Sequence, residues 1–179
     1  MDSSTTEQRL IAAAKQGDVG AFEAILGPVI AAAHRYACAL LQDPDLAEDA
    51  VQEASVRAWR KLDQLRPGST FLPWFLGIVA RQCHDQRRGR WWQMIRQPHT
   101  ETPSLEQPEE TALRRATLRE SLAQLGEGER QVIVLRAYLE LPWLDVARAT
   151  GLTEAGARTR YYRALERLRF ARGSQEVVT

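Results

Sequence analysis

The chain has 179 residues, of which 44% are hydrophobic and 26% charged, and its formal net charge is +1 at pH 7. This length allows one or two compact domains, and no apolar run approaches the ~20 residues of a membrane span. The first residues, Met1 to Gln8, lack the basic and then apolar pattern of a secretory signal, and two cysteines are too few for a disulfide framework. We therefore expect a protein of the reducing cytoplasm with no membrane contact of its own.

Helical periodicity dominates residues 1–96, the first predicted domain, and no alternating run suggests a strand. Gly17-Asp18 is expected to end one helix and cap the next, and Gly27-Pro28 to start a new one. Asp43-Pro44 combines a cap with a first-turn proline, and Pro67-Gly68 predicts a turn. The expected helices cover residues 9–15, 21–26, 29–41, 45–65 and 72–90.

Acidic residues concentrate in the helix that follows Asp43, since residues 43–63 carry six acids against three bases. On a helix, Asp49 and Gln52 share a face, with Glu53 beside them. Such a face suggests a basic protein surface as partner. A metal or catalytic site is less favoured, because no histidine and no second acidic motif lies nearby.

The next long helix is basic, with five arginines against a single acid in residues 81–96. A second basic helix lies near the C-terminus, so the two suggest two contacts with one polyanion. Trp74 is expected in the core because helical spacing puts it in phase with Ile78. Trp91 and Trp92 could stack on bases or cover the end of the domain.

Residues 97–111 are predicted to form a flexible linker. Between Gln97 and Glu110 there are three prolines and four acids without one Lys or Arg, a composition that cannot bury enough apolar surface to fold. Helical patterns resume over residues 113–125 and 130–139 of a second domain, 112–173, which is followed by a tail, 174–179. The expected fold class is all-α, with two small helical domains joined by a flexible linker and a helix-turn-helix ending the second.

Residues 141–169 have the pattern of a DNA-binding helix-turn-helix. Pro142 suits the first turn of a helix, Gly151 supplies the tight turn out of it, and Thr153 is a good N-cap for the next helix. That second helix should bury one apolar stripe, formed by Ala157, Tyr161, Leu165 and Leu168. Six arginines and one acid lie between residues 158 and 172. Such a helix presents guanidinium groups to phosphates and guanine edges.

These segments together resemble bacterial sigma factors of the short, two-domain extracytoplasmic-function (ECF) group. The run Ala47-Glu-Asp-Ala-Val-Gln-Glu53 resembles the family's polymerase-binding helix, and Trp74-Phe-Leu-Gly-Ile-Val-Ala-Arg81 resembles its promoter-melting helix. Gly17-Asp-Val-Gly-Ala-Phe22 resembles its opening, while Arg130-Gln-Val-Ile-Val-Leu135 and the helix-turn-helix resemble its C-terminal domain. The resemblance covers residues 10–170, with every motif in the family's order.

The resemblance implies a factor that is not an enzyme and holds no cofactor or metal. Such a factor binds core RNA polymerase, recognises the minus-ten and minus-thirty-five promoter elements and initiates transcription of a specific regulon. The implied partners are the clamp of the largest polymerase subunit, the flap of the second-largest subunit, promoter DNA and an anti-sigma factor.

Carried over residue by residue, the resemblance assigns three surfaces. Polymerase binding falls on Asp49, Gln52 and Glu53. Minus-ten recognition and melting fall on Arg66, Ser69, Phe71, Arg81, Gln82, Asp85, Arg87 and Arg88, where residues 66–71 match a loop that captures a flipped base. Minus-thirty-five recognition falls on Thr153, Glu154, Arg158, Thr159, Arg160, Arg163 and Arg167.

Two positions depart from the family's pattern. Gln82 stands where many relatives have Asn, and Gly156 lies inside the expected recognition helix. A glycine there lowers helical propensity by roughly 1 kcal/mol relative to alanine. The resemblance to the family persists with these departures, and they bear on which promoter sequence is read.

Two other classes of protein remain as alternatives. One is a two-domain helix-turn-helix regulator that binds duplex DNA without polymerase, against which the acidic helix argues. The other is a metal or redox protein, because His34 and Cys38 lie one helical turn apart and could meet Cys83 and His84 at a zinc ion. Small buried cysteines are the favoured interpretation, since adjacent residues of a helix point in different directions.

Overall fold

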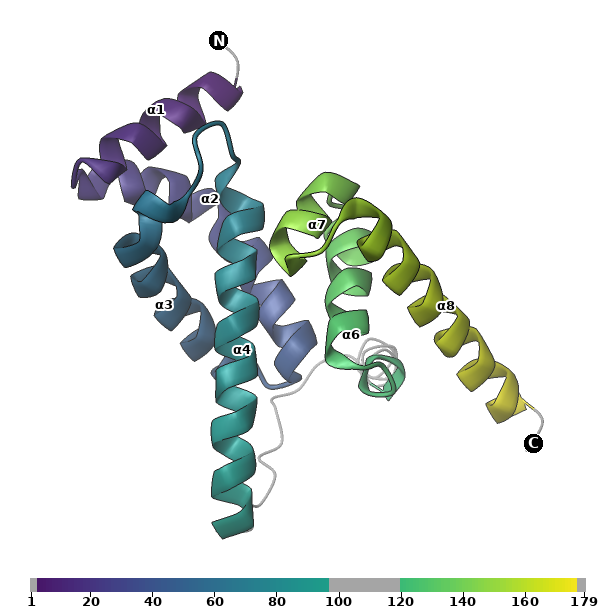
Figure 1. The fold of residues 1–179 in the computed structure, drawn as a ribbon. Helices are drawn as coiled ribbons and strands as arrows, with labels where there is room; N and C mark the ends of the chain where they lie inside the picture. The colour runs from purple at the N-terminus through teal and green to yellow at the C-terminus, as the bar shows by residue number, and fades with distance from the viewer. Residues whose placement is uncertain (1–2, 97–119, 177–179) are drawn as a thin grey trace, which may run out of the picture.

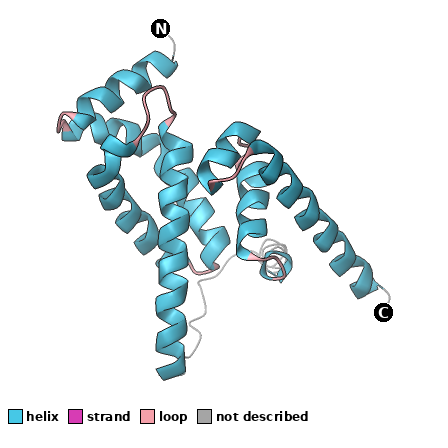
Figure 2. Cartoon of the chain, in the orientation of Figure 1, coloured by secondary structure: helices cyan, strands magenta, loops and turns pink. Residues whose placement is uncertain are grey.

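The computed structural model describes residues 3–96 and 120–176, and its side chains over residues 5–88 and 120–169. All regular structure in these ranges is helical, which confirms the all-α class (Figures 1 and 2). The elements are α1 (Ser3–Lys15), α2 (Val19–Leu41), α3 (Pro44–Lys61), the 3-10 turn η1 (Leu62–Gln64), α4 (Phe71–Arg96), α6 (Glu127–Ile133), the π-helical η2 (Val134–Tyr138), α7 (Trp143–Thr150) and α8 (Glu154–Glu176). The predicted linker, 97–111, lies outside the described residues, and α8 extends into the predicted tail.

The first domain is built around α2, whose apolar side packs against α1, α3 and α4. Tyr36, Phe71 and Phe75 are its largest fully buried side chains. By length and composition alone α2 could also cross a membrane, which corrects the expectation that no apolar run approaches the length of a span. Here it contributes seven buried residues to the core, the role expected of a central helix in a helical bundle.

The expected caps of the first domain are present. The Asp18 carboxylate accepts a hydrogen bond from the Ala21 backbone N–H at 3.0 Å, and Asp43 accepts one from Leu46 at 3.1 Å. Each bond satisfies an N–H group that the first turn of a helix leaves unpaired. Gly68 has a φ of 73° in the turn before α4, a backbone conformation that favours glycine.

The break expected at Gly27-Pro28 is wrong, because α2 runs unbroken through Pro28. A proline in a helix removes the hydrogen bond to the carbonyl four residues earlier, here that of Ala24. Ala24 and Pro28 both lie on the exposed side of α2, where water can bond that carbonyl. Pro28 does remove a backbone hydrogen bond, as the sequence indicated. Burial of the two halves of α2 on either side of it outweighs this loss.

The second domain contains the predicted helix-turn-helix. Val146 and Ala147 are buried, and Gly151 ends α7 in the left-handed conformation with a φ of 69°. The Thr153 hydroxyl accepts a hydrogen bond from the Gly156 N–H at 3.1 Å and so caps α8. The helix before the helix-turn-helix, α6, begins at Glu127, three residues before the expected start at residue 130. Its N-terminus is capped because the Glu129 side chain accepts from the Gly126 N–H at 2.9 Å.

The two domains lie in direct contact in this structure. α7 packs beside the upper half of α4, α6 approaches the end of α2, and α8 extends away from the first domain (Figure 1). The buried apolar residues of both domains form one connected cluster. The sequence predicted two domains but not this contact between them.

Candidate nucleic-acid interface

α8 is the second helix of the helix-turn-helix, and one of its faces is exposed. At helical spacing it carries Ala155, Arg158, Thr159, Tyr162 and Arg163, all of them exposed. Thr153 and Glu154 are exposed at its N-terminal end. This arrangement gives a helix with two guanidinium groups, a hydroxyl and a phenol on its free side, which are groups that hydrogen-bond to base edges and phosphates.

Tyr162 was missed by the sequence interpretation, although its ring is 58% exposed. It lies four residues after Arg158 and three after Thr159, so helical periodicity alone could have placed it on the same face. The Tyr161 ring contacts it edge to face, with centroids 5.5 Å apart, and Tyr161 in turn contacts Trp143 at 5.3 Å. The row of three rings connects the exposed tyrosine to α7.

The expected minus-thirty-five residues divide into two groups. Arg158 stays on the free face, with its guanidinium 5.3 Å from the centroid of the Trp143 ring. Arg160 turns toward α6 and packs over Gly128, where an added Cβ would lie 2.6 Å from its Nη1. Arg167 forms an ion pair with Glu129 at 2.9 Å. The last two arginines therefore hold α8 to α6, which spacing along α8 could not reveal.

Gly156 is explained by the cap of α8. A Cβ added to this residue would lie 3.1 Å from the Thr153 hydroxyl oxygen, which accepts the Gly156 N–H. A larger side chain would crowd the capping group. The glycine thus lowers helical propensity but gives the threonine room to cap the helix.

The acidic face of α3 is exposed as expected. Asp49, Gln52 and Glu53 all face solvent, and the Gln52 amide donates to the Glu48 carboxylate at 3.2 Å. Val56, 48% exposed, lies next to them and adds an apolar group that the sequence interpretation missed. The opposite face of α3 is buried and consists of Ala47, Ala50, Val51, Ala54 and Ala58. Small residues there let α3 pack closely while the acids face outward.

The loop before α4 is held by α1. Gln8 donates to the Ser69 carbonyl oxygen at 2.9 Å, and Glu7 accepts from the Phe71 N–H at 2.9 Å. Arg66 is exposed and Ser69 is half-buried. Phe71, expected among the base-contacting residues, is instead completely buried, with its ring stacked 5.5 Å from that of Phe75. That expectation is corrected, because the first turn of α4 directs this ring into the core.

The expected minus-ten residues of α4 also differ in exposure. Arg81, Asp85, Arg87 and Arg88 are exposed, whereas Gln82 is only 3% exposed. With its amide oxygen turned toward α3, Gln82 accepts from Arg57 Nη1 at 3.0 Å. The expectation that Gln82 contacts DNA is therefore corrected to a role inside the protein. Arg57, which the sequence interpretation missed, also lies 3.6 Å from the Asp85 carboxylate.

A cavity of about 700 Å³ lies between the two domains. Trp74 lines it and is half-buried, so this side chain belongs only partly to the core. Four basic side chains and two carboxylates face the cavity: Arg57, Lys61, Arg81, Arg148, Asp85 and Glu127. Its walls come from α3 and α4 on one side and from α6 and α7 on the other. The side chains of Trp91 and Trp92 lie outside the described residues.

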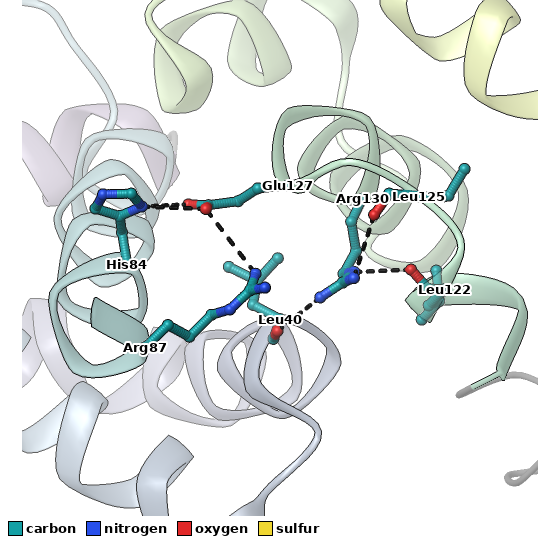
Figure 3. Close-up of polar contacts among 7 residues, drawn as sticks. All are labelled: Leu40, His84, Arg87, Leu122, Leu125, Glu127 and Arg130. Carbon is teal, nitrogen blue, oxygen red and sulfur yellow. Dashed lines mark hydrogen bonds and ion pairs between the residues drawn. The ribbon is translucent and has the colours of Figure 1, made fainter. Parts of the chain in front are cut away.

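The residues of the metal or redox alternative are not gathered at one point. Nowhere in the described part of the chain do three or more His, Cys, Asp and Glu side chains cluster as metal ligands would. Cys38 Sγ lies 3.7 Å from the His34 ring nitrogens, while His84 contacts Glu127 (Figure 3). Burial raises the pKa of the Cys83 thiol to about 12, and the nearby Glu127 charge adds to the shift. Cys83 is therefore a protonated core residue at neutral pH.

Fold and exposed surfaces together define a two-domain helical protein with a DNA-binding helix-turn-helix. Comparison with known families identifies both domains. Residues 21–93 match Sigma-70 region 2, and residues 115–168 match Sigma-70, region 4.

Known sigma factors are similar over most of the chain. The ECF RNA polymerase sigma factor SigL of Mycobacterium tuberculosis is 30% identical over 142 residues, which cover 75% of this chain and 79% of SigL. The RNA polymerase sigma factor CarQ of Myxococcus xanthus is 26% identical over 167 residues, or 91% of this chain and 95% of CarQ. The chain belongs to the ECF group of RNA polymerase sigma factors, which act in transcription initiation.

Solved structures show the same fold. CnrH, solved in complex with the cytosolic domain of CnrY, superposes with a TM-score of 0.74 at 24% identity, over 94% of this chain and 98% of CnrH. RpoE from Bartonella quintana, solved with the anti-sigma factor NepR, gives a TM-score of 0.70 at 26% identity, over 84% of this chain and 95% of RpoE. The two-domain helical architecture is thus that of solved sigma factors.

Proposed function

We propose that this sigma factor binds core RNA polymerase through α3, reads the minus-thirty-five element through α8 and reads and melts the minus-ten element through α4. It acts in the cytoplasm as a specificity subunit without a catalytic centre, and it initiates transcription of a specific regulon. The observation that carries the proposal is the exposed face of α8, which is the second helix of the helix-turn-helix and is capped by Thr153.

The α8 face fits the major groove of duplex DNA. A recognition helix contacts base edges with the residues of its first turns, and phosphates with residues further along. Arg158 and Thr159 occupy those first turns and are exposed, and Arg163 follows one turn later. Arg158 is held against Trp143, so less side-chain freedom is lost when it binds a base.

The minus-ten element is proposed to meet α4 and the loop before it. Arg81, Arg87 and Arg88 supply charge for the backbone of a melted strand, while Arg66 and Ser69 flank the loop that would receive a flipped base. Asp85, paired with Arg57, is the acceptor on this face. Gln82 is buried under this face, where it contacts Arg57, and does not touch DNA.

The exposed acids of α3 suit a basic surface on the clamp of the largest polymerase subunit. Asp49, Gln52 and Glu53 lie beside the apolar Val56, and an exposed apolar group next to polar ones is typical of protein interfaces. In the second domain, Tyr138 and Leu144 are 57% and 47% exposed and suit the flap of the second-largest subunit. The structurally similar RpoE was solved with an anti-sigma factor, and we propose that an anti-sigma factor regulates this chain as well.

Run-off transcription with purified core polymerase on a promoter library tests the proposal. We expect transcripts from a small set of promoters that share two elements, and none from core alone. Transcription that is equal on all templates would contradict promoter recognition. A gel shift with duplex promoter DNA, with and without core, tests the alternative regulator, which would bind tightly without core.

A further inference from the structure

The loop of residues 65–70, between η1 and α4, is tied to α1, which lies at least 50 residues earlier in the chain (Figure 1). Lys15 donates from Nζ to the Leu65 carbonyl oxygen at 2.6 Å. The Gln8 amide makes two bonds: Nε2 donates to the Ser69 carbonyl oxygen at 2.9 Å, and Oε1 accepts from the Gly68 N–H at 3.3 Å. The backbone of the loop is therefore held at its start and at its turn.

The start of α4 is also capped from α1 and not by the residue that precedes the helix. The Glu7 carboxylate accepts from the Phe71 N–H at 2.9 Å, and a negative charge suits this end of a helix. A capping threonine accepts from the N–H of the second or third helical residue, but the third residue of α4 is Pro73, which has none. Within the described residues, the Thr70 hydroxyl is buried without a hydrogen-bond partner. Glu7 thus supplies the cap that Thr70 does not.

The loop has little local structure to fix it, whereas α1 is anchored in the core. Within the loop, the Ser69 N–H donates to the Arg66 carbonyl oxygen at 3.1 Å and closes a tight turn. A surface turn of this kind is mobile unless other parts of the protein hold it. On α1, Ile11 and Ala14 are only 5% and 3% exposed. The bonds from α1 therefore attach the loop to a rigid part of the first domain.

A loop that receives a flipped base binds it more tightly when its conformation is already set. Ordering a flexible segment on binding subtracts from the affinity, and a segment held in its bound conformation avoids this cost. Here α1 bonds to the backbone of the loop, while Arg66 is exposed and Ser69 is half-buried. These side chains keep free surface for DNA because the bonds from α1 go to backbone groups.

We propose that Glu7 and Gln8 are positioning residues for minus-ten recognition, which hold the loop of residues 65–70 in the conformation that receives the flipped base. The inference rests on the proposed function, because a preset loop matters for promoter opening only if this loop takes up a base. Both side chains are half-buried and bonded to the loop or to the first residue of α4. The charge of Glu7 alone would repel DNA, so its contribution to DNA binding comes through the backbone that it holds.

Binding of single-stranded promoter DNA to the holoenzyme tests this proposal. The probe is a labelled non-template strand with the minus-ten sequence of a promoter found in the library experiment, either intact or with an abasic site at each position in turn. The position where base loss weakens binding of the unchanged chain marks the captured base. We expect Gln8→Ala to weaken binding of the intact strand about two- to tenfold, the effect of a lost hydrogen bond. Its affinity for the strand without the captured base should equal that of the unchanged chain.

Two variants of Glu7 separate positioning from charge. Glu7→Ala removes the acceptor of the Phe71 N–H, and we expect it to bind the intact strand about two- to tenfold more weakly, although loss of an acid would by charge alone strengthen binding. Glu7→Gln keeps an acceptor and removes only the charge, so its affinity should equal or exceed that of the unchanged chain. The control is Gln16→Ala, at an exposed glutamine just after α1, which should change nothing. Affinity for core polymerase should be the same in all four variants.

The possible failures give different results. Equal losses by Gln8→Ala on the intact and abasic strands would show that α1 only stabilises the fold and would overturn the proposal. Unchanged binding of the intact strand by Gln8→Ala would overturn it too, as would a Glu7→Gln variant as weak as Glu7→Ala. If instead the proposed function is wrong, the unchanged chain will not support transcription with core polymerase, or no abasic site will weaken its binding.

Discussion

The two arginine-rich helices proposed to touch DNA differ in what lies against them. On α8, Arg158 and Arg163 face solvent, and the arginines that form contacts with α6, such as Arg167, stay within one domain. On α4, Arg87 pairs with Glu127 of the other domain, and Arg81 faces a cavity between the two. Similar composition therefore produces one surface that faces solvent alone and one that borders the other domain. Whether an arginine helix is available to DNA depends on which element packs against it.

Removing the buried arginine should have the largest effect on this arrangement. Arg130 donates to three carbonyl oxygens, of which Leu122 and Leu125 belong to its own domain and Leu40 to the other. Arg130→Met leaves these acceptors without a donor, so we expect the free energy of unfolding to fall by about 3 kcal/mol or more. Urea denaturation measures the change. The exposed Arg163→Met should cost less than about 0.5 kcal/mol, and a similar small loss in Arg130→Met would contradict this account.

The exposed acids of α3 should matter for polymerase and not for folding. Combining Asp49→Ala, Gln52→Ala and Glu53→Ala removes interface groups with little packing, so we expect affinity for core to fall by at least about 2 kcal/mol, roughly 30-fold. Circular dichroism should remain that of the unchanged chain. The control is Glu23→Ala, an exposed acid on α2. Retained affinity in the triple variant would show that polymerase does not bind this face.

Single substitutions can distinguish the exposed arginine of α8 from one that packs against α6. Arg158→Ala should cost about 1–3 kcal/mol on the preferred upstream element and relax sequence preference there. Arg160→Ala should affect DNA binding less, because this side chain packs over Gly128. Binding of the holoenzyme to duplex variants measures both. Equal losses for the two would mean that Arg160 leaves α6 when DNA binds.

Arginines further along α8 should affect all sequences alike. Arg163→Ala should weaken binding to every promoter variant and reduce the salt dependence by roughly one unit of slope. Arg167→Ala should do less, since Arg167 is paired with Glu129. A salt titration of the holoenzyme on two unrelated promoters distinguishes them. A sequence-dependent loss in Arg163→Ala would instead make it a base-reading residue.

The buried thiol of Cys83 on α4 should make stability fall at alkaline pH. Burial, together with Glu127, raises the pKa of Cys83 from 9.0 to about 12. A raised folded-state pKa favours the protonated thiol, so its contribution to stability is constant below pH 9 and is lost as pH rises toward 12. We expect wild type to lose about 1 kcal/mol more than Cys83→Ala between pH 9 and 10. The test is urea denaturation at both pH values, and identical losses would contradict the raised pKa.

Metal removal should have the smallest effect. His34 and Cys38 are on α2, while His84 of α4 is turned to Glu127, so these side chains do not converge. We expect less than one zinc per chain and no shift of the melting temperature with a chelator, since packing holds the fold. Stoichiometric zinc that is lost in Cys38→Ser would support the metal alternative.

Local chemistry in the sequence predicted most of the fold. Capping by Asp18, Asp43 and Thr153 is confirmed, as is the tight turn at Gly151, because each involves only neighbours along the chain. The helix break predicted at Gly27-Pro28 is absent for a tertiary reason, because residues on both sides of it are buried in one core. Tyr162 was within reach of helical periodicity and was overlooked.

The sequence by itself determined the helical class, the helix-turn-helix and the acidic face of α3, because spacing along a helix decides which residues share a face. Only the tertiary structure decided which of those faces are free. Gln82 carries no local sign that it is buried, and Gly77 carries none that Ala149 will lie against it. Contacts between distant segments depend on the packing of whole helices, so the pairing of Glu127 with α4 could be seen only after the domains were placed together.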